Sequence, residues 1–394
     1  MSSKTRSGLT VFMLILLAIS AFAAGYFVND LLALREQSAH AQENMNIFWE
    51  AWGLVDDHFI GELPTENLRT YGAIRGSFDT LGDPYTVFVE PVARDVEKER
   101  LQGSFGGIGA YISRPEEGGD VLLEPIPGNP AEAAGILSGD VLLMVDGTAV
   151  TAEMTVNEIV DLIKGEKGTE VILTVRHSDA IDSVDIAIER ADILIPSVLA
   201  RVLEEDPSIG YIQLSRFSGE SGTEVADALV DLLDQGVTKI ILDMRSNPGG
   251  LLEAAVDVSD QFLDAGSVLF QQSSNGDERE FKTTNKTLAA DVPLVVLVNG
   301  GTASAAEIVA GALQDRERAV LIGNEKTFGK GSVQLVFDLS DGSSVHVTSA
   351  RWFTPDHNQI DGQGLEPDIL VEITQEAVDN GIDELLQTAV EQLQ

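Results

Sequence analysis

Ser304 stands between a glycine pair and an apolar helical stretch in the segment NGGTASAAEIVAG, residues 299–311. At a strand-to-helix turn, the first helix amides lack internal partners and carry the positive end of the helix dipole. The amide of Ala305 could therefore hold an oxygen that becomes negative during acyl transfer. The same segment also fits a helix start without catalysis, because Ser304 and Glu307 have the Ser-x-x-Glu spacing of a capping box.

A serine nucleophile needs a base, and Lys330 in KTFGKGSVQ is a candidate. A neutral amine can accept the serine proton and return it to the leaving amine. Free lysine has a pKa near 10.4, so burial must lower the pKa to about 7–8 before the amine is useful. Phe328 and Val333 are expected to supply apolar cover. Gln334, on the same face of a following strand, could orient the amine without adding charge.

Other assignments of this chemistry stay open at the level of sequence. His346 or His357 could be the base of a Ser-His-Asp triad, since spacing alone excludes neither. A phosphate-binding loop is disfavoured, because five residues instead of four separate Gly323 from Gly329. In addition, the lysine of that segment is followed by Gly331 instead of a hydroxyl residue.

A second glycine-rich turn, RSNPGG at residues 245–250, follows another apolar run. Its free amides would lie at a second helix start, where they can bind a negative oxygen. Gly249 or Gly250 is therefore a candidate second donor beside Ala305 for an oxyanion hole.

Two similar strand–turn–helix units would position these residues. The first runs from TKIILDMRSNPGG into LLEAAVDVSDQFL, and the second runs from DVPLVVLVNGGTAS into AAEIVAGALQD. Residues 240–242 and 294–298 are continuous apolar runs, which are typical of strands buried on both faces. Alternating strands and helices predict an α/β core with a partly parallel sheet over residues 190–394.

Residues 94–178 have a different pattern, in which short strands accompany one amphipathic helix. Asp146-Gly147 between apolar runs indicates a hairpin turn. Thr155 and Glu158 could form the capping box of the helix that follows. About 85 residues of this kind predict a separate, mainly-β domain inserted before the α/β core.

The N-terminus indicates export. Lys4 and Arg6 precede an apolar run at residues 8–28, which is long enough for the roughly 20 residues that span a bilayer. Positive charge before the run predicts that everything after it lies outside. A cleaved signal peptide is the alternative, because residues 21–23 and 39–41 fit the small-x-small cleavage pattern. Under either interpretation, the rest of the chain is expected to be exported.

Residues 1–30 are accordingly interpreted as a cytoplasmic tip and transmembrane anchor, and residues 43–93 as a helical segment. In that segment Phe48, Trp52, Val55 and Phe59 recur at helical spacing and form one apolar face.

The composition limits the partners and the chemistry. With 64 acidic and 25 basic residues the formal net charge is −39, which disfavours nucleic acid and indicates a solvated acidic surface. The chain has no cysteine, which excludes disulfides, thiolate metal sites and a cysteine nucleophile.

Taken together, LDMRSNPGG, VLVNGGTASAAEIVAGALQD and KTFGKGSVQ resemble the signatures of the C-terminal processing peptidases, or tail-specific serine proteases. GAIRGSFDTLGDPYT near the start and TPDHNQIDGQGLEPDI near the end do so as well, and the match runs in order from about residue 43 to 372. The resemblance implies a crotonase-like α/β core and a dyad of Ser304 and Lys330 supported by Gln334. It also implies an oxyanion hole of Ala305 with Gly249 or Gly250, and no metal or cofactor.

The same resemblance identifies residues 94–178 with the PDZ domain that these enzymes insert before the catalytic core. The segment SFGGIGA would present backbone amides to a terminal carboxylate, and an extended peptide would add as a strand beside Tyr111 and Ile112. The helix would form the other wall of the groove. The expected peptide-binding residues are Phe105, Gly106, Gly107, Ile108, Gly109, Ile159 and Ile163.

The sequence therefore predicts an exported, membrane-anchored serine endopeptidase that takes protein or peptide C-termini through a PDZ domain and cleaves them with a Ser-Lys dyad. An inactive peptide-binding scaffold and a Ser-His-Asp hydrolase are the alternatives. The physiological substrate, the tail preference, the oligomeric state and the role of Glu307 do not follow from the sequence, although self-association is common in the family.

Overall fold

The structure, a computed structural model, describes residues 45–394 except residues 117, 179, 285 and 286. The predicted anchor within residues 1–30 lies outside the described residues. Within the described part of the chain, no helix has the length and apolar character needed to cross a bilayer. The chain divides between Ala73 and Ile74 into two compact units.

The first unit contains a helical stretch at residues 45–58 and the beginning of α2 (Glu66–Asp79), which crosses the boundary. Phe48 and Trp52, one helical turn apart, meet edge to face with their ring centroids 6.4 Å apart. The guanidinium of Arg69 lies over the Trp52 ring at 5.1 Å. The predicted apolar spacing therefore provides contacts inside this unit.

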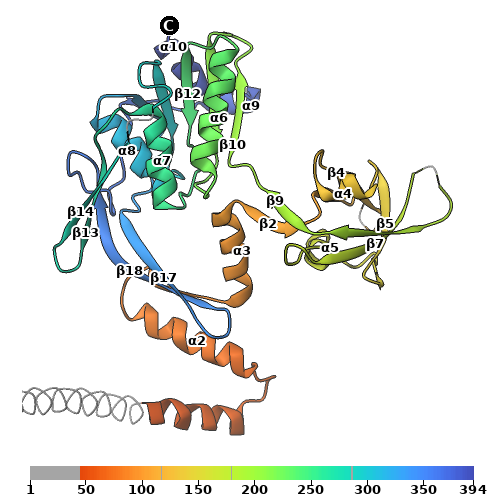
Figure 1. Ribbon diagram of the computed structural model, residues 1–394. Helices are drawn as coiled ribbons and strands as arrows, with labels where there is room; N and C mark the ends of the chain where they lie inside the picture. Colours follow the sequence, from red (N-terminus) through yellow and green to blue (C-terminus); the bar gives the residue numbers. More distant parts are fainter. Residues whose placement is uncertain (1–44, 117, 179, 285–286) are drawn as a thin grey trace, which may run out of the picture. The chain divides into compact units, whose positions relative to one another are not determined.

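The second unit is built around a six-stranded sheet (Figure 1) with the order β10-β11-β12-β15-β16-β19. Within this sheet, each of the neighbouring pairs from β11 through β12, β15 and β16 to β19 is parallel. Strand β10 pairs antiparallel with β11 at one edge. The strands are β10 (Val198–Val202), β11 (Ile209–Leu214), β12 (Lys239–Asp243), β15 (Leu294–Val298), β16 (Val320–Gly323) and β19 (Ile369–Leu370). The α/β class and the partly parallel sheet that the sequence predicts are confirmed.

Helices cover both faces of this sheet. Side chains on a strand alternate between the two faces, so a central strand can contribute to two hydrophobic cores. Along β15, Leu294 and Val296 join the core under α6 (Ser221–Asp234), α7 (Leu252–Phe262) and α8 (Ala305–Asp315). Val295 and Leu297 face the other way and pack with Leu385 of α10 (Glu384–Gln392), which follows α9 (Gln375–Asn380). A central strand buried on both faces explains the unbroken apolar run in its sequence.

A second, antiparallel sheet extends from this core, with β18 at its centre. Its strands are β1 (Val87–Val89), β13 (Ser267–Ser273), β14 (Glu278–Lys282), β17 (Ser332–Asp338) and β18 (Ser344–Phe353). Trp352 of β18 is 1% exposed and joins the main hydrophobic core, which fixes the two sheets to each other. Helix α3 (Pro91–Gln102) follows β1 and is tied to β17 by the hydrogen bond from Arg94 to Asp338.

The inserted domain is entered through β2 (Ser104–Gly107) and left through β9 (Ala191–Leu194), which pair antiparallel. Its sheet has the order β3-β4-β5-β7-β8, with β6 beside β5. The strands are β3 (Ala110–Ser113), β4 (Val121–Pro125), β5 (Asp140–Val145), β6 (Thr148–Ala149), β7 (Glu170–Arg176) and β8 (Val184–Glu189), and the helices are α4 (Pro130–Ala134) and α5 (Val156–Ile163). Strand β8, which belongs to this sheet, comes after residue 178.

Local sequence signals in this domain act as expected. Asp146 and Gly147 both have positive φ, 47° and 77°, in the turn that joins β5 to β6, as a two-residue hairpin requires. The capping box at the start of α5 is present: the amide of Glu158 donates to Thr155 Oγ1 at 3.2 Å, and the amide of Thr155 donates to Glu158 Oε2 at 2.7 Å. Both predictions are confirmed.

Candidate active site

Two loops meet at the carboxyl end of the main sheet, where parallel sheets commonly place their ligand sites. We call residues 245–250 the PGG loop and residues 299–304 the serine loop. They follow β12 and β15, which are neighbours in the sheet. The amide of Ser246 donates to Asn299 Oδ1 at 2.7 Å, and the amide of Ala303 donates to the Asn247 carbonyl at 2.9 Å. These cross-loop bonds hold the two glycine-rich turns in fixed register.

Ser304 has an unusual backbone conformation, with φ 56° and ψ −117°, immediately before α8. A serine with positive φ is strained by about 1–3 kcal/mol, and such strain is characteristic of functional sites. The amide of Ser304 donates to Glu307 Oε2 at 2.8 Å, which helps to hold this turn in place. The sharp turn lets the Ser304 side chain line a cavity, although the side chain is only partly exposed.

The two candidate oxyanion-hole loops touch at Gly249. A Cβ added to Gly249 would lie 2.8 Å from the Ala305 nitrogen and 2.8 Å from the Ser304 Cβ. The Gly249 amide already donates to Asn247 Oδ1 at 2.9 Å. Among the described residues, neither the Gly250 amide nor the Ala305 amide has an acceptor. The hydrogen bonding therefore favours Gly250, and not Gly249, as the partner of Ala305.

Glu307 joins the serine loop to the segment at residues 327–330, which ends in Lys330, a role that its sequence position did not reveal. Its carboxylate is fully buried and accepts four hydrogen bonds. Oε2 accepts from the amides of Ser304 at 2.8 Å and Lys330 at 2.9 Å, and Oε1 accepts from Thr327 Oγ1 at 2.6 Å and the Gly329 amide at 2.7 Å. One side chain therefore sets the positions of both candidate catalytic residues.

The surroundings of Lys330 favour its neutral form. Burial lowers the pKa of Lys330 below its ordinary value of 10.5, while the negative charges of Glu97 and Glu307 oppose this change. The amine lies 5.4 Å from the centre of the Tyr85 ring, which covers it. The cover expected from Phe328 is absent, because this side chain is 59% exposed. Tyr85 belongs to the GDPYT segment, far from Lys330 in sequence.

A single cavity of about 620 Å³ brings the predicted catalytic groups together. Its lining includes Ser304, Lys330, Gln334, Ala305, Gly249 and Gly250. Gln334 Nε2 donates to Ser332 Oγ at 2.8 Å and to Thr348 Oγ1 at 3.4 Å. In the described structure no hydrogen bond links the Lys330 amine to the serine or to the glutamine. Catalytic hydrogen bonds are often long or poorly aligned before substrate binds, so this arrangement is compatible with catalysis.

The two candidate histidine bases have different surroundings. His346 lines the same cavity, and its Nε2 lies 3.2 Å from Glu97 Oε2 and 3.2 Å from Ser344 Oγ. His357 stacks on Phe270 with ring centroids 4.1 Å apart and does not line the cavity. The structure therefore brings only His346 into the cavity that contains the serine.

The predicted peptide-binding loop divides into two parts. Phe105, Gly106 and Gly107 lie in β2 and pair with β9, where a Cβ on Gly106 would meet the Gly165 carbonyl at 2.0 Å. Ile108 and Gly109 follow, and their carbonyls accept the amides of Ala131 and Ile126. Their own amides have no acceptor among the described residues. Only this second part has amides that could receive a carboxylate.

The groove walls also differ from the expectation. Strand β3, with Tyr111 and Ile112, lies at the edge of its sheet, where a peptide strand could add. Ile159 and Ile163 are 0% and 3% exposed and belong to the core of the domain, so their side chains do not face a groove. The apolar residues of α5 recur at helical spacing because they pack against the sheet in the core of the domain.

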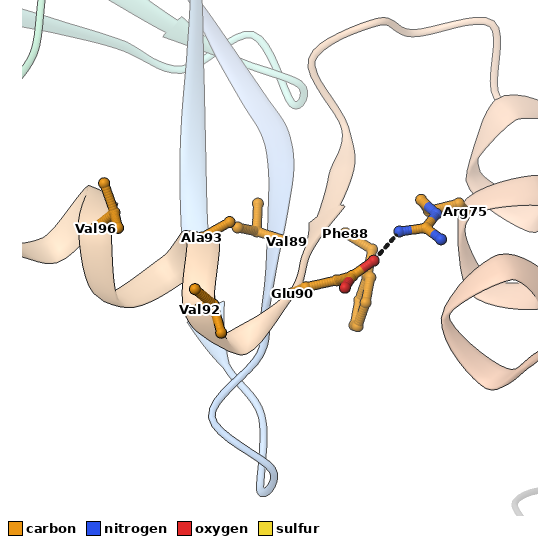
Figure 2. Close-up of a pocket in the computed structure, with 7 residues that line it drawn as sticks. All are labelled: Arg75, Phe88, Val89, Glu90, Val92, Ala93 and Val96. Atoms are coloured by element: carbon orange, nitrogen blue, oxygen red, sulfur yellow. Dashed lines mark hydrogen bonds and ion pairs between the residues drawn. The ribbon is translucent and has the colours of Figure 1, made fainter. Parts of the chain in front are cut away.

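A second hollow, shown in Figure 2, lies between the end of β1 and the apolar face of α3. Val92, Ala93 and Val96 line it together with Phe88, and its charged groups, Arg75 and Glu90, are paired with each other. It holds no group suited to catalysis. No cluster of three or more His, Asp or Glu side chains able to hold a metal ion occurs in the part of the chain that the structure describes.

Comparison with known proteins gives two family matches. Residues 208–371 match peptidase family S41, and residues 121–177 match the PDZ domain. A carboxyl-terminal-processing protease of Synechocystis is 38% identical over 82% of this chain and 75% of its own length. The carboxy-terminal processing protease CtpA of Bacillus subtilis is 35% identical over 92% of this chain and 77% of its own length. The solved structure of a photosystem II D1 C-terminal processing protease is 36% identical, covering 82% of this chain and 86% of that one, with a TM-score of 0.47.

The fold and the cavity, together with these matches, define a serine-type peptidase with a PDZ domain. The chain belongs to peptidase family S41, and within it to the carboxyl-terminal processing proteases.

Proposed function

We propose that this peptidase is an exported endopeptidase that cleaves protein C-terminal tails with a dyad of Ser304 and Lys330. The observation that carries the proposal is the shared cavity, in which a strained serine and a lysine of lowered pKa are tied to the same buried carboxylate, Glu307. The export part of the proposal rests on Lys4, Arg6 and the apolar run at residues 8–28 of the sequence.

In the proposed mechanism the neutral amine of Lys330 takes the proton of Ser304 Oγ as this oxygen attacks the scissile carbonyl. The amides of Ala305 and Gly250 stabilise the negative oxygen of the tetrahedral intermediate. The ammonium of Lys330 then gives its proton to the leaving amine, which releases the C-terminal fragment. Water, deprotonated by the same amine, hydrolyses the acyl-enzyme and regenerates Ser304.

The PDZ domain would hold the substrate tail during this reaction. The free edge of β3 can add an extended peptide, and the amides of Ile108 and Gly109 can receive its terminal carboxylate. An adjacent apolar wall must come from residues other than Ile159 and Ile163, since both lie in the core.

The test uses an unstructured protein tail as substrate and mass spectrometry to follow its cleavage. Ser304→Ala and Lys330→Ala should each lower kcat by at least about 1,000-fold while circular dichroism shows an unchanged fold. Ser208→Ala, a serine outside the cavity, should leave kcat unchanged. Activity retained in Ser304→Ala would reject the nucleophile.

Among the described residues, His346 is the histidine that lines the cavity, where its Nε2 lies beside Glu97. With the dyad as proposed, His346→Ala and His357→Ala both keep their activity. If His346→Ala is inactive and Lys330→Ala is active, the histidine is the base. Binding of tails without cleavage by the unmodified protein would instead favour a peptide-binding scaffold.

A further inference from the structure

Three arginines line the catalytic cavity without an acidic partner, although acidic residues dominate the chain. Among the described residues, Arg100, Arg216 and Arg279 take part in no ion pair. Seven other arginines do: Arg69, Arg75, Arg94, Arg176, Arg245, Arg316 and Arg351. Four further described arginines, Arg114, Arg190, Arg201 and Arg318, also take part in no ion pair, but none of them lines the cavity, whereas Arg100, Arg216 and Arg279 share it.

Arg216 is the best placed of the three. Its Nη2 donates to the Ile195 carbonyl, whereas its Nε is buried and has no hydrogen-bond partner. A buried guanidinium nitrogen without an acceptor is costly, and such groups normally find one. Burial lowers the pKa of Arg216, the positive charge of Arg100 acts in the same direction, and only Glu224 opposes them. An arginine nevertheless stays protonated, so its charge needs an anionic partner.

The position of Arg216 relates this charge to the reacting atoms. It precedes Phe217, whose amide donates to the Gly249 carbonyl at 3.0 Å and whose carbonyl accepts the Leu251 amide at 3.0 Å. Arg216 is therefore one residue away from the backbone that borders Gly250, the favoured oxyanion donor. Arg216, Gly250 and Ser304 all line the same cavity.

The acids of the cavity do not neutralise these arginines. Glu97 is bound to Arg94 and to His346. Glu253 lies in the first turn of α7, where the helix dipole stabilises a carboxylate. Glu224, which also acts on Arg216, is occupied by the amides of Ser197 and Val198 and by Ser197 Oγ.

We propose that Arg216, together with Arg100, forms a subsite inside the catalytic cavity for a carboxylate of the substrate close to the scissile bond. The inference rests on the proposed peptidase function and adds a specificity to it. A guanidinium binds a carboxylate in the planar, two-pronged geometry that matches both groups.

The size of the cavity limits which carboxylates qualify. A sphere of the same volume, about 620 Å³, would be about 10 Å across, the length of about three residues of extended chain. The carboxylate is therefore either an Asp or Glu side chain within about three residues of the scissile bond, or the α-carboxylate of a tail that ends equally close to it.

The experiment measures binding to the full chain carrying Ser304→Ala, so that its readout does not depend on cleavage. Four fluorescent peptides combine a free or an amidated C-terminus with Glu or Gln near the centre of the sequence. Dissociation constants from anisotropy are compared between this protein and the same protein with Arg216→Gln. Because the PDZ domain is the same in both proteins, its contribution to binding cancels in the ratio of the two dissociation constants for each peptide.

Arg216→Gln should weaken binding by about tenfold to a hundredfold for peptides that bear the recognised carboxylate, and should change little for the amidated Gln peptide. Loss confined to free-acid peptides identifies the α-carboxylate, and loss confined to Glu peptides identifies the side chain. The dissociation constant of Arg216→Lys for these peptides should lie between those of the Arg216 protein and of Arg216→Gln, because lysine keeps the charge and lacks the planar guanidinium. Arg201→Gln, an exposed arginine outside the cavity, is the control.

Arg100→Gln provides a second variant if Arg216→Gln fails to fold, since Arg100 is exposed and makes no ion pair among the described residues. Equal ratios for all four peptides, or no measurable binding of any carboxylate peptide before substitution, would overturn the subsite. Binding that follows the expected pattern while the unmodified protein cleaves nothing would instead contradict the proposed peptidase mechanism and leave the subsite supported.

Discussion

Lys330 and Glu97 line the same cavity. Burial of the amine and the negative charge of Glu97 have opposite effects on the pKa of Lys330. The pKa of Lys330 is lower in the folded chain than its ordinary value because of burial, and Glu97 opposes that change. Since only the neutral amine is a base, activity should rise as the pH increases through this pKa. The same shift makes the folded chain progressively less stable as the pH falls from the ordinary pKa of 10.5 toward the lower folded-state pKa, because in this range the unfolded chain binds a proton that the buried amine does not.

Glu97→Gln removes the charge that favours the ammonium, so the pKa of Lys330 should fall further. The acid limb of the profile of kcat/KM against pH should move to lower pH by up to about one unit. Asp95→Asn, an exposed residue of the same helix that does not line the cavity, should leave the profile in place. An unchanged or oppositely moved limb in Glu97→Gln would contradict control of the amine by this carboxylate.

The glycine of the oxyanion hole gives a second prediction at this scale. Gly250 has φ 149°, and a Cβ there would lie 1.9 Å from the Phe217 carbonyl oxygen. Gly250→Ala should therefore displace the PGG loop, lower kcat by about 100-fold or more, and destabilise the chain by more than about 2 kcal/mol. Activity assays and urea unfolding measure the two effects.

Gly236→Ala is the matched control, because Gly236 has φ 90° but nothing within 4 Å of an added Cβ. It should lose about 1–2 kcal/mol from backbone strain alone and keep its activity. If the two variants behave alike, the steric contact with Phe217 has no role in shaping the site.

Ser304 and Lys330 can be predicted as a dyad because their local signals are strong: a serine at a strand-to-helix turn and a lysine between glycines. The sequence does not identify Tyr85 as the cover of Lys330, because the two are joined only by the tertiary fold. Glu307 was interpreted as a helix cap, which it is in part, since it accepts the Ser304 amide. Its other three hydrogen bonds, to Thr327, Gly329 and Lys330, join residues about 20 positions apart, and no helical or strand period in the sequence predicts such contacts.

At the scale of elements, α3 lies beside the cavity and contributes Glu97, Arg100 and Leu101 to it. The helix is secured by Arg94, whose Nε donates to Asp338 Oδ1 at 2.9 Å and whose Nη1 donates to Glu97 Oε2 at 2.8 Å. Arg94 is only 9% exposed, so these bonds are partly shielded from water. No local pattern predicts this contact, because Arg94 and Asp338 are 244 positions apart in the chain.

Arg94→Ala should therefore loosen α3, lower the free energy of unfolding by about 1–3 kcal/mol and raise KM. Lys98→Ala removes a more exposed partner of the same Asp338, at 3.4 Å, and should cost less than about 1 kcal/mol. Urea unfolding and steady-state kinetics distinguish the two variants. Equal losses in both would show that the buried position of Arg94 does not matter.

The strand–turn–helix units were predictable as elements because each carries its own apolar period and turn residues. The way β12 and β15 pair was not, since neighbouring parallel strands are set by packing between distant segments. The same limit applies to α5: its period correctly indicated a helix, but the face that it defines packs into the domain core through Ile159 and Ile163. An apolar stripe alone does not distinguish a groove wall from a core contact.

At the scale of the whole molecule, the PDZ domain is an insertion whose two ends are adjacent. Gly107 and Ala191 are paired residues on β2 and β9, so their Cα atoms are about 5 Å apart. No residue between them lines the catalytic cavity in the described chain. In the described chain the cavity is thus lined without side chains from the insertion.

Replacing residues 108–190 by a two-residue Asn-Gly turn should leave a folded core, because such a turn suits the β2–β9 hairpin. Cleavage of short peptides should stay within a few-fold of the intact enzyme, while kcat/KM for long unstructured tails should fall by at least about tenfold, since the capture site is gone. A control with Gly128→Ala, where φ is 78° and an added Cβ meets nothing within 4 Å, should lose about 1–2 kcal/mol from backbone strain and keep both activities. If the excised enzyme folds, as judged by circular dichroism, but cuts neither substrate, the domain assembles the active site and does more than hold the tail.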